Sequence, residues 1–79
     1  MDNNVSARDA ALEILERVKE IATLFDRCDG KTNDAMICIS ISDGFIFINA
    51  ADHGKEDFNW LFRLQYARDT AELIDLKTE

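Results

Sequence analysis

With 79 residues, 47% of them hydrophobic and 32% charged, the chain is expected to form one domain over residues 1–79, because cores rarely divide below about 150 residues. The net charge of −7 repels phosphate backbones and anionic lipids. The longest apolar run, Phe45 to Ile48, falls far short of the roughly 20 residues of a membrane span, and no secretory signal opens the chain. We therefore expect a cytoplasmic domain that binds neither nucleic acid nor membranes.

A first helix is predicted over residues 7–28. The Ser6 hydroxyl can cap a free backbone N–H, and Asp9 places an acid near the positive end of the helix dipole. Gly30 suits a left-handed residue that closes the helix, and residues 31–34 form a polar link. At 100° per residue, one apolar stripe collects Ala7, Ala11, Ile14, Val18, Ile21, Ala22 and Phe25, flanked by Ala10, Leu15 and Cys28.

Two strands, residues 35–42 and 45–50, are predicted to form an antiparallel hairpin. Side chains alternate in character along both segments, and Asp43-Gly44 between them is a strong two-residue turn signal, which favours positive φ at both positions. A two-residue turn sets Ile41 opposite Ile46 and Ile39 opposite Ile48. One face of the hairpin then carries Ile37, Ile39, Ile41, Ile46 and Ile48, and the other carries Met36, Cys38, Phe45 and Phe47 with Ser40 and Ser42.

A second helix is predicted over residues 58–76, capped by Asp57 and following a polar connection that contains Gly54. Its helical wheel has two apolar sides. One side carries Trp60, Leu64, Ala67, Ala71 and Ile74, and the other carries Phe58, Phe62, Tyr66, Leu73 and Leu76.

These elements predict an α+β fold of the order helix, β-hairpin, helix, in a small two-layer domain. Two strands are not stable alone, and both faces of this hairpin are apolar. One helix on each face would close the fold within a monomer. Alternatively, both helices cover the isoleucines and two copies pair their hairpins or second helices across a twofold axis. We favour the homodimer, because so short a chain buries little of its own surface. Its expected interface contains Phe45, Phe47, Phe58, Phe62, Tyr66 and Leu73.

The sequence offers little chemistry for catalysis or for a metal. Asp52-His53 is the one place where an imidazole follows a carboxylate, with Cys38 or Ser40 as conceivable nucleophiles, but adjacent loop residues seldom aim at one another. Cys28 and Cys38 are expected to be free thiols in a reducing compartment, with no second cysteine pair to complete a zinc site. We therefore expect no enzyme, no cofactor and no metal, and a solvent-facing His53.

Acidic residues are concentrated in the middle of the chain, where residues 28–57 hold six acids against two lysines. This pattern favours a non-enzymatic module, of inhibitor or immunity type, that occupies a basic surface of another protein. Small phage-encoded inhibitors and bacterial immunity proteins are analogous in size and charge only. The alternative is a structural or chaperone-like adaptor whose Phe45/Phe47 or Phe62/Tyr66 patch binds an apolar client segment. The charge-led reading assigns partner binding to Asp29, Asp34, Asp43, Asp52, Glu56 and Asp57.

Overall fold

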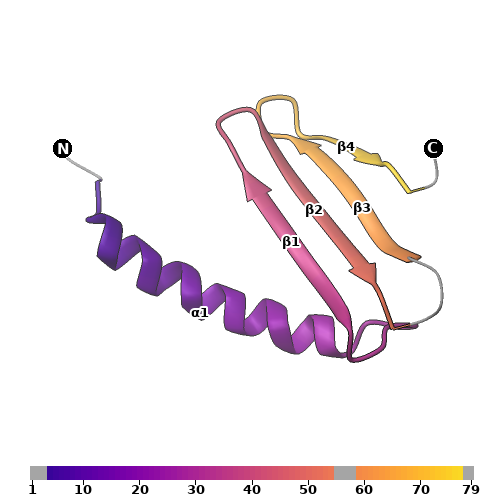
Figure 1. The fold of residues 1–79 in the computed structure, drawn as a ribbon. Coiled ribbons are helices and arrows are strands. Elements are labelled where there is room, and N and C mark those ends of the chain that lie inside the picture. The colour runs from indigo at the N-terminus through magenta and orange to yellow at the C-terminus, as the bar shows by residue number, and fades with distance from the viewer. Residues whose placement is uncertain (1–3, 55–58, 78–79) are drawn as a thin grey trace.

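The computed structural model describes residues 4–54 and 59–77, in which one helix precedes four strands (Figure 1). The elements are α1 (Ala7–Asp26), β1 (Ala35–Ile41), β2 (Phe45–Asp52), β3 (Asn59–Ala67) and β4 (Glu72–Asp75). The strands form one antiparallel sheet in the order β1-β2-β3-β4. The α+β class is confirmed, whereas the order helix, hairpin, helix is wrong because the described residues contain a single helix.

The start of α1 is as predicted, and its end comes two residues earlier. Ser6 Oγ accepts a hydrogen bond from Asp9 N at 3.1 Å, so Ser6 is the N-cap, with Asp9 in the first turn. The last helical residue is Asp26 rather than residue 28. Gly30 has a φ of 85°, the left-handed conformation expected for it, but lies in the loop beyond the helix. Within the described residues, no helix combines the length and the apolar character of a membrane span.

The β1–β2 hairpin has the predicted register. Ile41 pairs with Ile46 and Ile39 with Ile48, and Ser42 N donates to Phe45 O at 2.9 Å. The turn itself differs from the prediction, since neither Asp43 nor Gly44 has positive φ. Ser42 Oγ instead accepts a hydrogen bond from Phe45 N at 3.3 Å, which stabilises the turn from within.

The predicted helix over residues 58–76 is wrong, because residues 59–67 form β3, residues 68–71 a turn and residues 72–75 β4. Phe62, Leu64 and Tyr66 occupy every second position, which is the period of a strand, and aromatic residues such as Trp60 favour strands. The two apolar sides of the helical wheel are thus spread over two strands. Asp57 and Phe58, the expected cap and first residue of that helix, lie outside the described residues.

Strand pairing sorts the side chains of the sheet into two faces. Ala50 pairs with both Ile37 and Phe62, and Leu64 pairs with Ile48, so these residues share one face. A register shift between Ala50 and Ala51 leaves Leu61 as the extra residue of a β-bulge in β3. We call the face that carries α1 the isoleucine face; it comprises Ile37, Ile39, Ile41, Ile46, Ile48, Ala50, Phe62, Leu64, Tyr66 and Leu73.

The opposite face is partly covered by contacts among its own side chains. The Arg63 guanidinium carbon lies 4.5 Å from the centroid of the Trp60 ring, a cation–π contact. The ring centroids of Phe45 and Phe47 are 5.9 Å apart. In the described residues no helix lies over this face.

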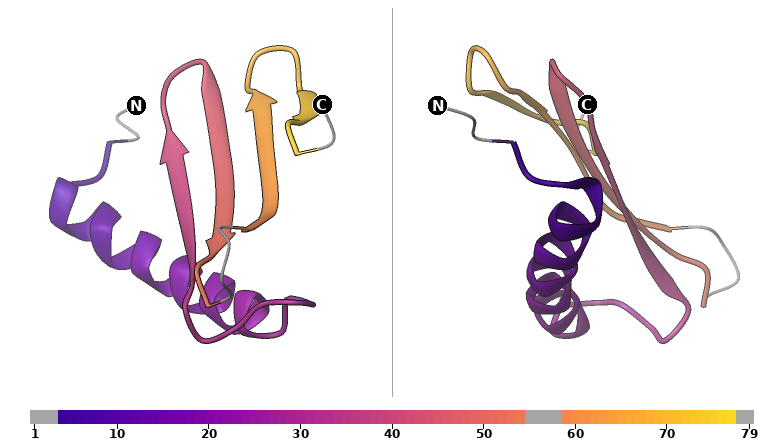
Figure 2. Two further views of the ribbon diagram at one scale, coloured as in Figure 1. Left: turned by 45° about the vertical axis from the view of Figure 1, so that its right-hand side comes forward. Right: turned by 90° about the vertical axis from the view of Figure 1, so that its left-hand side faces the viewer.

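The helix meets the sheet at one end only. α1 runs away from the sheet toward its N-terminus and extends past the outer edge of β1, as the views in Figures 1 and 2 agree. The molecule is correspondingly elongated, with extents of 53 × 27 × 16 Å and a radius of gyration of 15.1 Å. A compact chain of this length has a radius of gyration of about 12 Å. Among the described apolar residues only Ala50 is fully buried.

A candidate protein-interaction surface

The side chains of the apolar stripe of α1 become more exposed from the C-terminal end of the helix to the N-terminal end. Phe25 and Ile21 are half-buried against the sheet, whereas Val18 is 42% exposed and Ile14 is 60% exposed. All four residues lie on the same side of the helix, so the difference reflects the distance of each from the sheet. The space between the stripe and the isoleucine face is an open apolar wedge, lined by Val18, Ile21 and Phe25 of α1 and by Ile37, Ile39 and Phe62 of the sheet. Ile14 continues the wedge by one turn along the same stripe of α1.

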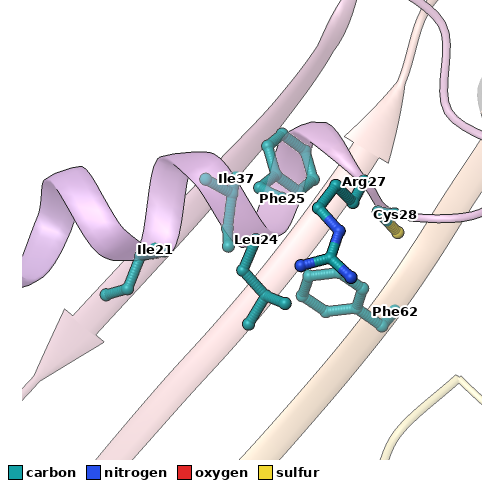
Figure 3. Close-up of a pocket in the computed structure, with 7 residues that line it drawn as sticks. All are labelled: Ile21, Leu24, Phe25, Arg27, Cys28, Ile37 and Phe62. Atoms are coloured by element: carbon teal, nitrogen blue, oxygen red, sulfur yellow. The ribbon is translucent and has the colours of Figure 1, made fainter.

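The narrow end of the wedge is closed by aromatic contact. The rings of Phe25 and Phe62 meet edge to face, with centroids 6.4 Å apart and an interplanar angle of 89°. On one side of this contact lies a cavity of about 350 Å³, lined by the residues in Figure 3. On the other side a cavity of about 300 Å³ is lined by Val18, Ile21 and Phe25 of α1 and Ile39 of β1, among others. The helix is therefore seated on the sheet without filling the space on either side of it.

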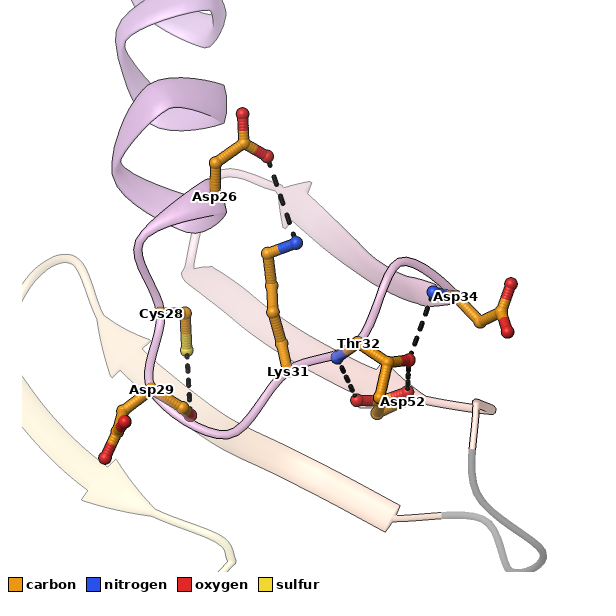
Figure 4. Close-up of polar contacts among 7 residues, drawn as sticks. All are labelled: Asp26, Cys28, Asp29, Lys31, Thr32, Asp34 and Asp52. Carbon is orange, nitrogen blue, oxygen red and sulfur yellow. Dashed lines mark hydrogen bonds and ion pairs between the residues drawn. The ribbon is translucent and has the colours of Figure 1, made fainter.

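A polar anchor fixes the loop between α1 and β1 to the far end of β2 (Figure 4). Asp52, only 1% exposed, accepts hydrogen bonds from Thr32 N and Thr32 Oγ1, both at 2.6 Å, and from Gly54 N at 2.8 Å. Thr32 Oγ1 in turn accepts from Asp34 N at 3.1 Å. Because a buried carboxylate needs such donors, this cluster holds the loop in one place.

Lys31 extends the anchor to the helix. Its Nζ lies 5.3 Å from the centroid of the Phe25 ring and 4.0 Å from Asp26 Oδ1, and its side chain is only 14% exposed. Cation–π contact and ion pairing together tie the last turn of α1 to the loop. The direction in which the helix leaves the sheet is thus set by the anchor and by the Phe25–Phe62 contact.

The outer edge of β1 adjoins the wedge. β1 is the first strand of the sheet, and no other strand of the described residues lies along its outer side. Its seven residues, Ala35–Ile41, include no charge and no proline, the devices that usually protect an edge from further pairing. The other edge strand, β4, has four residues and begins and ends with Glu72 and Asp75. The exposed edge and the wedge form one continuous candidate surface.

The residues assigned to a basic partner do not form one patch. Asp29 and Asp34 are exposed in the loop before β1, whereas Asp43 is exposed beyond the far end of that strand, about 23 Å away at 3.3 Å per residue. Asp52 is a buried member of the anchor, so its assignment to a partner-binding surface is corrected. Glu56 and Asp57 lie outside the described residues.

The residues predicted for a dimer interface fall on two faces. Phe45 and Phe47 lie on the opposite face of the sheet, while Phe62, Tyr66 and Leu73 lie on the isoleucine face. A single flat interface cannot contain both groups. Phe62 is partly covered by Phe25, whereas Leu73 is 62% exposed. Phe58 lies outside the described residues.

The conceivable catalytic residues are not brought together. In the β1–β2 register, Cys38 pairs with Asn49 and Ser40 with Phe47. His53, the first residue after β2, is four and six positions further along the chain than these partners. At 3.3 Å per residue these offsets are about 13 Å and 20 Å, too far for proton transfer. His53 is exposed, as expected. Cys28 and Cys38 are free thiols, and no group of three metal-ligating side chains occurs in the described residues.

Sequence reasoning identified the stripe of α1 but not its exposure, because hydrophobic periodicity shows which side of a helix is apolar and not what covers it. The uncharged edge strand was a readable signal that we did not use. The comparisons with known proteins add no further evidence: no protein-family model, curated protein or solved structure matches the chain.

Proposed function

We propose that this chain is a protein-binding module whose binding surface is the apolar wedge together with the outer edge of β1. The observation that carries the proposal is the exposure of Ile14 and Val18 on the stripe that seats Phe25 against the sheet. Exposed apolar residues that adjoin one another, as these do on one helix stripe, are typical of an interaction site in a folded protein.

The chemistry of the surface indicates the kind of segment it accepts. Most side chains that line the wedge are aliphatic or aromatic, with Asp26, Arg27 and Cys28 near the end of α1 as the exceptions, so the bound segment must present apolar side chains of its own. The edge of β1 offers backbone hydrogen bonds, which favours a segment in extended conformation beside it. This proposal is closer to the adaptor reading of the sequence than to the charge-led one.

A second candidate function is binding to a basic protein surface, and only two of the predicted acids that the structure describes support it. Asp29 and Asp34 are both exposed in the loop that leads into β1, the same loop that contains Thr32 of the anchor. A basic partner could contact this pair, and the association would then weaken as the salt concentration rises. We place these acids at the margin of the apolar surface, where they would affect the rate of association more than its strength.

Site-specific photo-crosslinking in the full chain tests the proposal. A benzoylphenylalanine is placed at Val18, within the wedge, or at Leu12, which is 51% exposed but about 120° away around α1. Each variant is irradiated in an extract of its native host, and mass spectrometry identifies the chain that is attached. We expect a protein adduct at Val18 in at least fivefold higher yield than at Leu12.

A matched pair of second substitutions makes the result specific. Ile14→Glu introduces a charge into the wedge, whereas Leu12→Glu introduces the same charge outside it, and both side chains are exposed, so neither change disturbs the core. The adduct at Val18 should fall at least fivefold with Ile14→Glu and persist with Leu12→Glu. Equal yields at the two positions, or an adduct indifferent to Ile14→Glu, would contradict the proposal. Loss of the adduct with Asp29→Asn and Asp34→Asn would favour the charge-led function instead.

A further inference from the structure

We infer that the segment bound at this surface is a second copy of the chain, paired through β1 in an antiparallel, twofold-symmetric dimer. The inference rests on the proposed function and names the partner for the same surface. Four features carry it: the free backbone groups of β1, the symmetry of such a pairing, the direction of α1, and the area left exposed.

The free backbone groups of β1 belong to its isoleucines. Ser42 N donates to Phe45 O, so Ser42 directs its backbone groups toward β2. Successive residues of an antiparallel strand direct their backbone N–H and C=O groups to opposite sides of the strand. The even-numbered residues of β1 therefore form hydrogen bonds with β2. Ile37, Ile39 and Ile41 direct their N–H and C=O groups toward the outer edge, where they are available to another strand.

Twofold symmetry fixes how two β1 strands can pair. The axis must be perpendicular to the sheet. Paired residues of antiparallel strands have their side chains on the same side of the sheet, so each residue pairs with one that is an even number of positions away, and one residue of β1 pairs with its own copy. With Cys38 on the axis, all seven residues of β1 pair, and Ile37 exchanges hydrogen bonds with Ile39 of the second copy. Cys38 and its copy form a pair without hydrogen bonds, with Cα atoms about 4.5 Å apart.

The direction of α1 suits this arrangement. The helix extends past the outer edge of β1 on the isoleucine face, so it would lie above the sheet of a copy placed beside that edge (Figure 1). The stripe residues Ile14 and Val18 would then cover Ile39 and Ile41 of the second copy, which are 39% and 66% exposed in the single chain. The twofold axis gives the first copy the same cover from the second helix. One pairing thus fills both wedges.

The exposed area is sufficient for a stable dimer. The chain exposes 6541 Å². A compact monomer of 9.0 kDa exposes about 4,900 Å², so about 1,600 Å² per chain is in excess. A stable protein interface buries about 800 Å² on each partner, and obligate homodimers bury more. A basic partner held at Asp29 and Asp34 alone would leave this excess area, and the exposed side chains of Ile14 and Ile41, in contact with water.

Sedimentation velocity of the full chain over a dilution series gives the first test. We expect twice the chain mass of 9.0 kDa at micromolar concentrations. Ile39→Pro removes an N–H that β2 does not use, so the fold is retained while the β1–β1 ladder is interrupted. We expect this variant, and Val18→Glu, to raise the dimer dissociation constant at least tenfold, and Leu12→Glu to change it less than twofold. Far-UV circular dichroism confirms that each variant is folded.

Cysteine crosslinking tests the register. With Cys28→Ser, oxidation by diamide should yield a Cys38–Cys38 disulfide dimer, because the Cα separation falls within the range for disulfides. With Cys38→Ser, Cys28 should yield none. A dimer that forms no Cys38 crosslink and is indifferent to Ile39→Pro would overturn the inference.

A chain that stays monomeric at high concentration would also overturn the inference. It would leave the proposed function intact if benzoylphenylalanine at Val18 still captured a different protein in the manner specified above. A monomer with no specific adduct at Val18 would contradict both proposals.

Discussion

The anchor at Asp52 should be the most sensitive polar site in the fold. Asp52→Ala removes a buried carboxylate that accepts two hydrogen bonds from Thr32 and one from Gly54. A hydrogen bond to a charged group contributes about 1.5 to 3 kcal/mol, and water can reach the exposed Gly54 N–H in the variant. We therefore count the two Thr32 bonds and expect a loss of about 3 to 6 kcal/mol in the free energy of unfolding. A domain of 79 residues has about 4 to 12 kcal/mol in total.

Urea unfolding measures this loss, with Trp60 fluorescence and far-UV circular dichroism as probes. All samples need the same chain concentration, because association stabilises the folded state by mass action. Asp43→Ala is the control, since Asp43 is exposed in the hairpin turn. Asp52→Asn, which keeps one acceptor oxygen, should fall between the two. If Asp52→Ala shifts the unfolding midpoint no more than Asp43→Ala does, the anchor does not hold the loop.

Three further substitutions test local features by the same unfolding measurement. Gly54→Ala places a Cβ against the Thr32 side chain and should lower the free energy of unfolding by about 1 to 3 kcal/mol. In the control Gly44→Ala the new Cβ meets no atom within 4 Å, and the change should be less than about 0.5 kcal/mol. Equal effects would contradict the packing at Gly54. Gly30→Ala forces a side chain into a φ of 85° and should cost about 1 to 2 kcal/mol, and a neutral result would show that the loop can adopt another conformation. Ser6→Ala removes the N-cap and should cost about 1 kcal/mol with a smaller helical signal at 222 nm; an unchanged signal would show that the cap does not matter.

The elements that were predicted correctly are those whose signals are local. Ser6 caps α1 by a contact three residues along the chain, and the hairpin register follows from a two-residue turn. The segment that became β3 carries apolar residues at spacings that match both a strand and a helix, and its pairing with β2 decided between them. Such pairing is a long-range contact, which the pattern of one segment cannot reveal.

The candidate surface was predictable only in part, for a similar reason. Periodicity predicted the stripe of α1 and the five isoleucines on one face of the hairpin correctly, but not the residues that β3 and β4 add to that face. The gap between them depends on the angle at which α1 leaves the sheet, and that angle is set by the anchor between Thr32 and Asp52, residues 20 positions apart in the chain. Asp52 was assigned to the surface because it lies in a segment that we predicted to be a polar connection, whereas Thr32, which donates two hydrogen bonds to it, comes from another loop.

Hydrogen exchange of the β1 amides, resolved by residue and compared between dilute and concentrated samples, tests the central claim most directly. The amides of Cys38 and Ser40 bond to β2 and should be protected at every concentration. Those of Ile37 and Ile39 face the outer edge, so we expect them to exchange quickly when dilute and to become protected as the chain associates. Rapid exchange of Ile37 and Ile39 at all concentrations, in a sample shown to be associated, would contradict the claim that another strand occupies this edge.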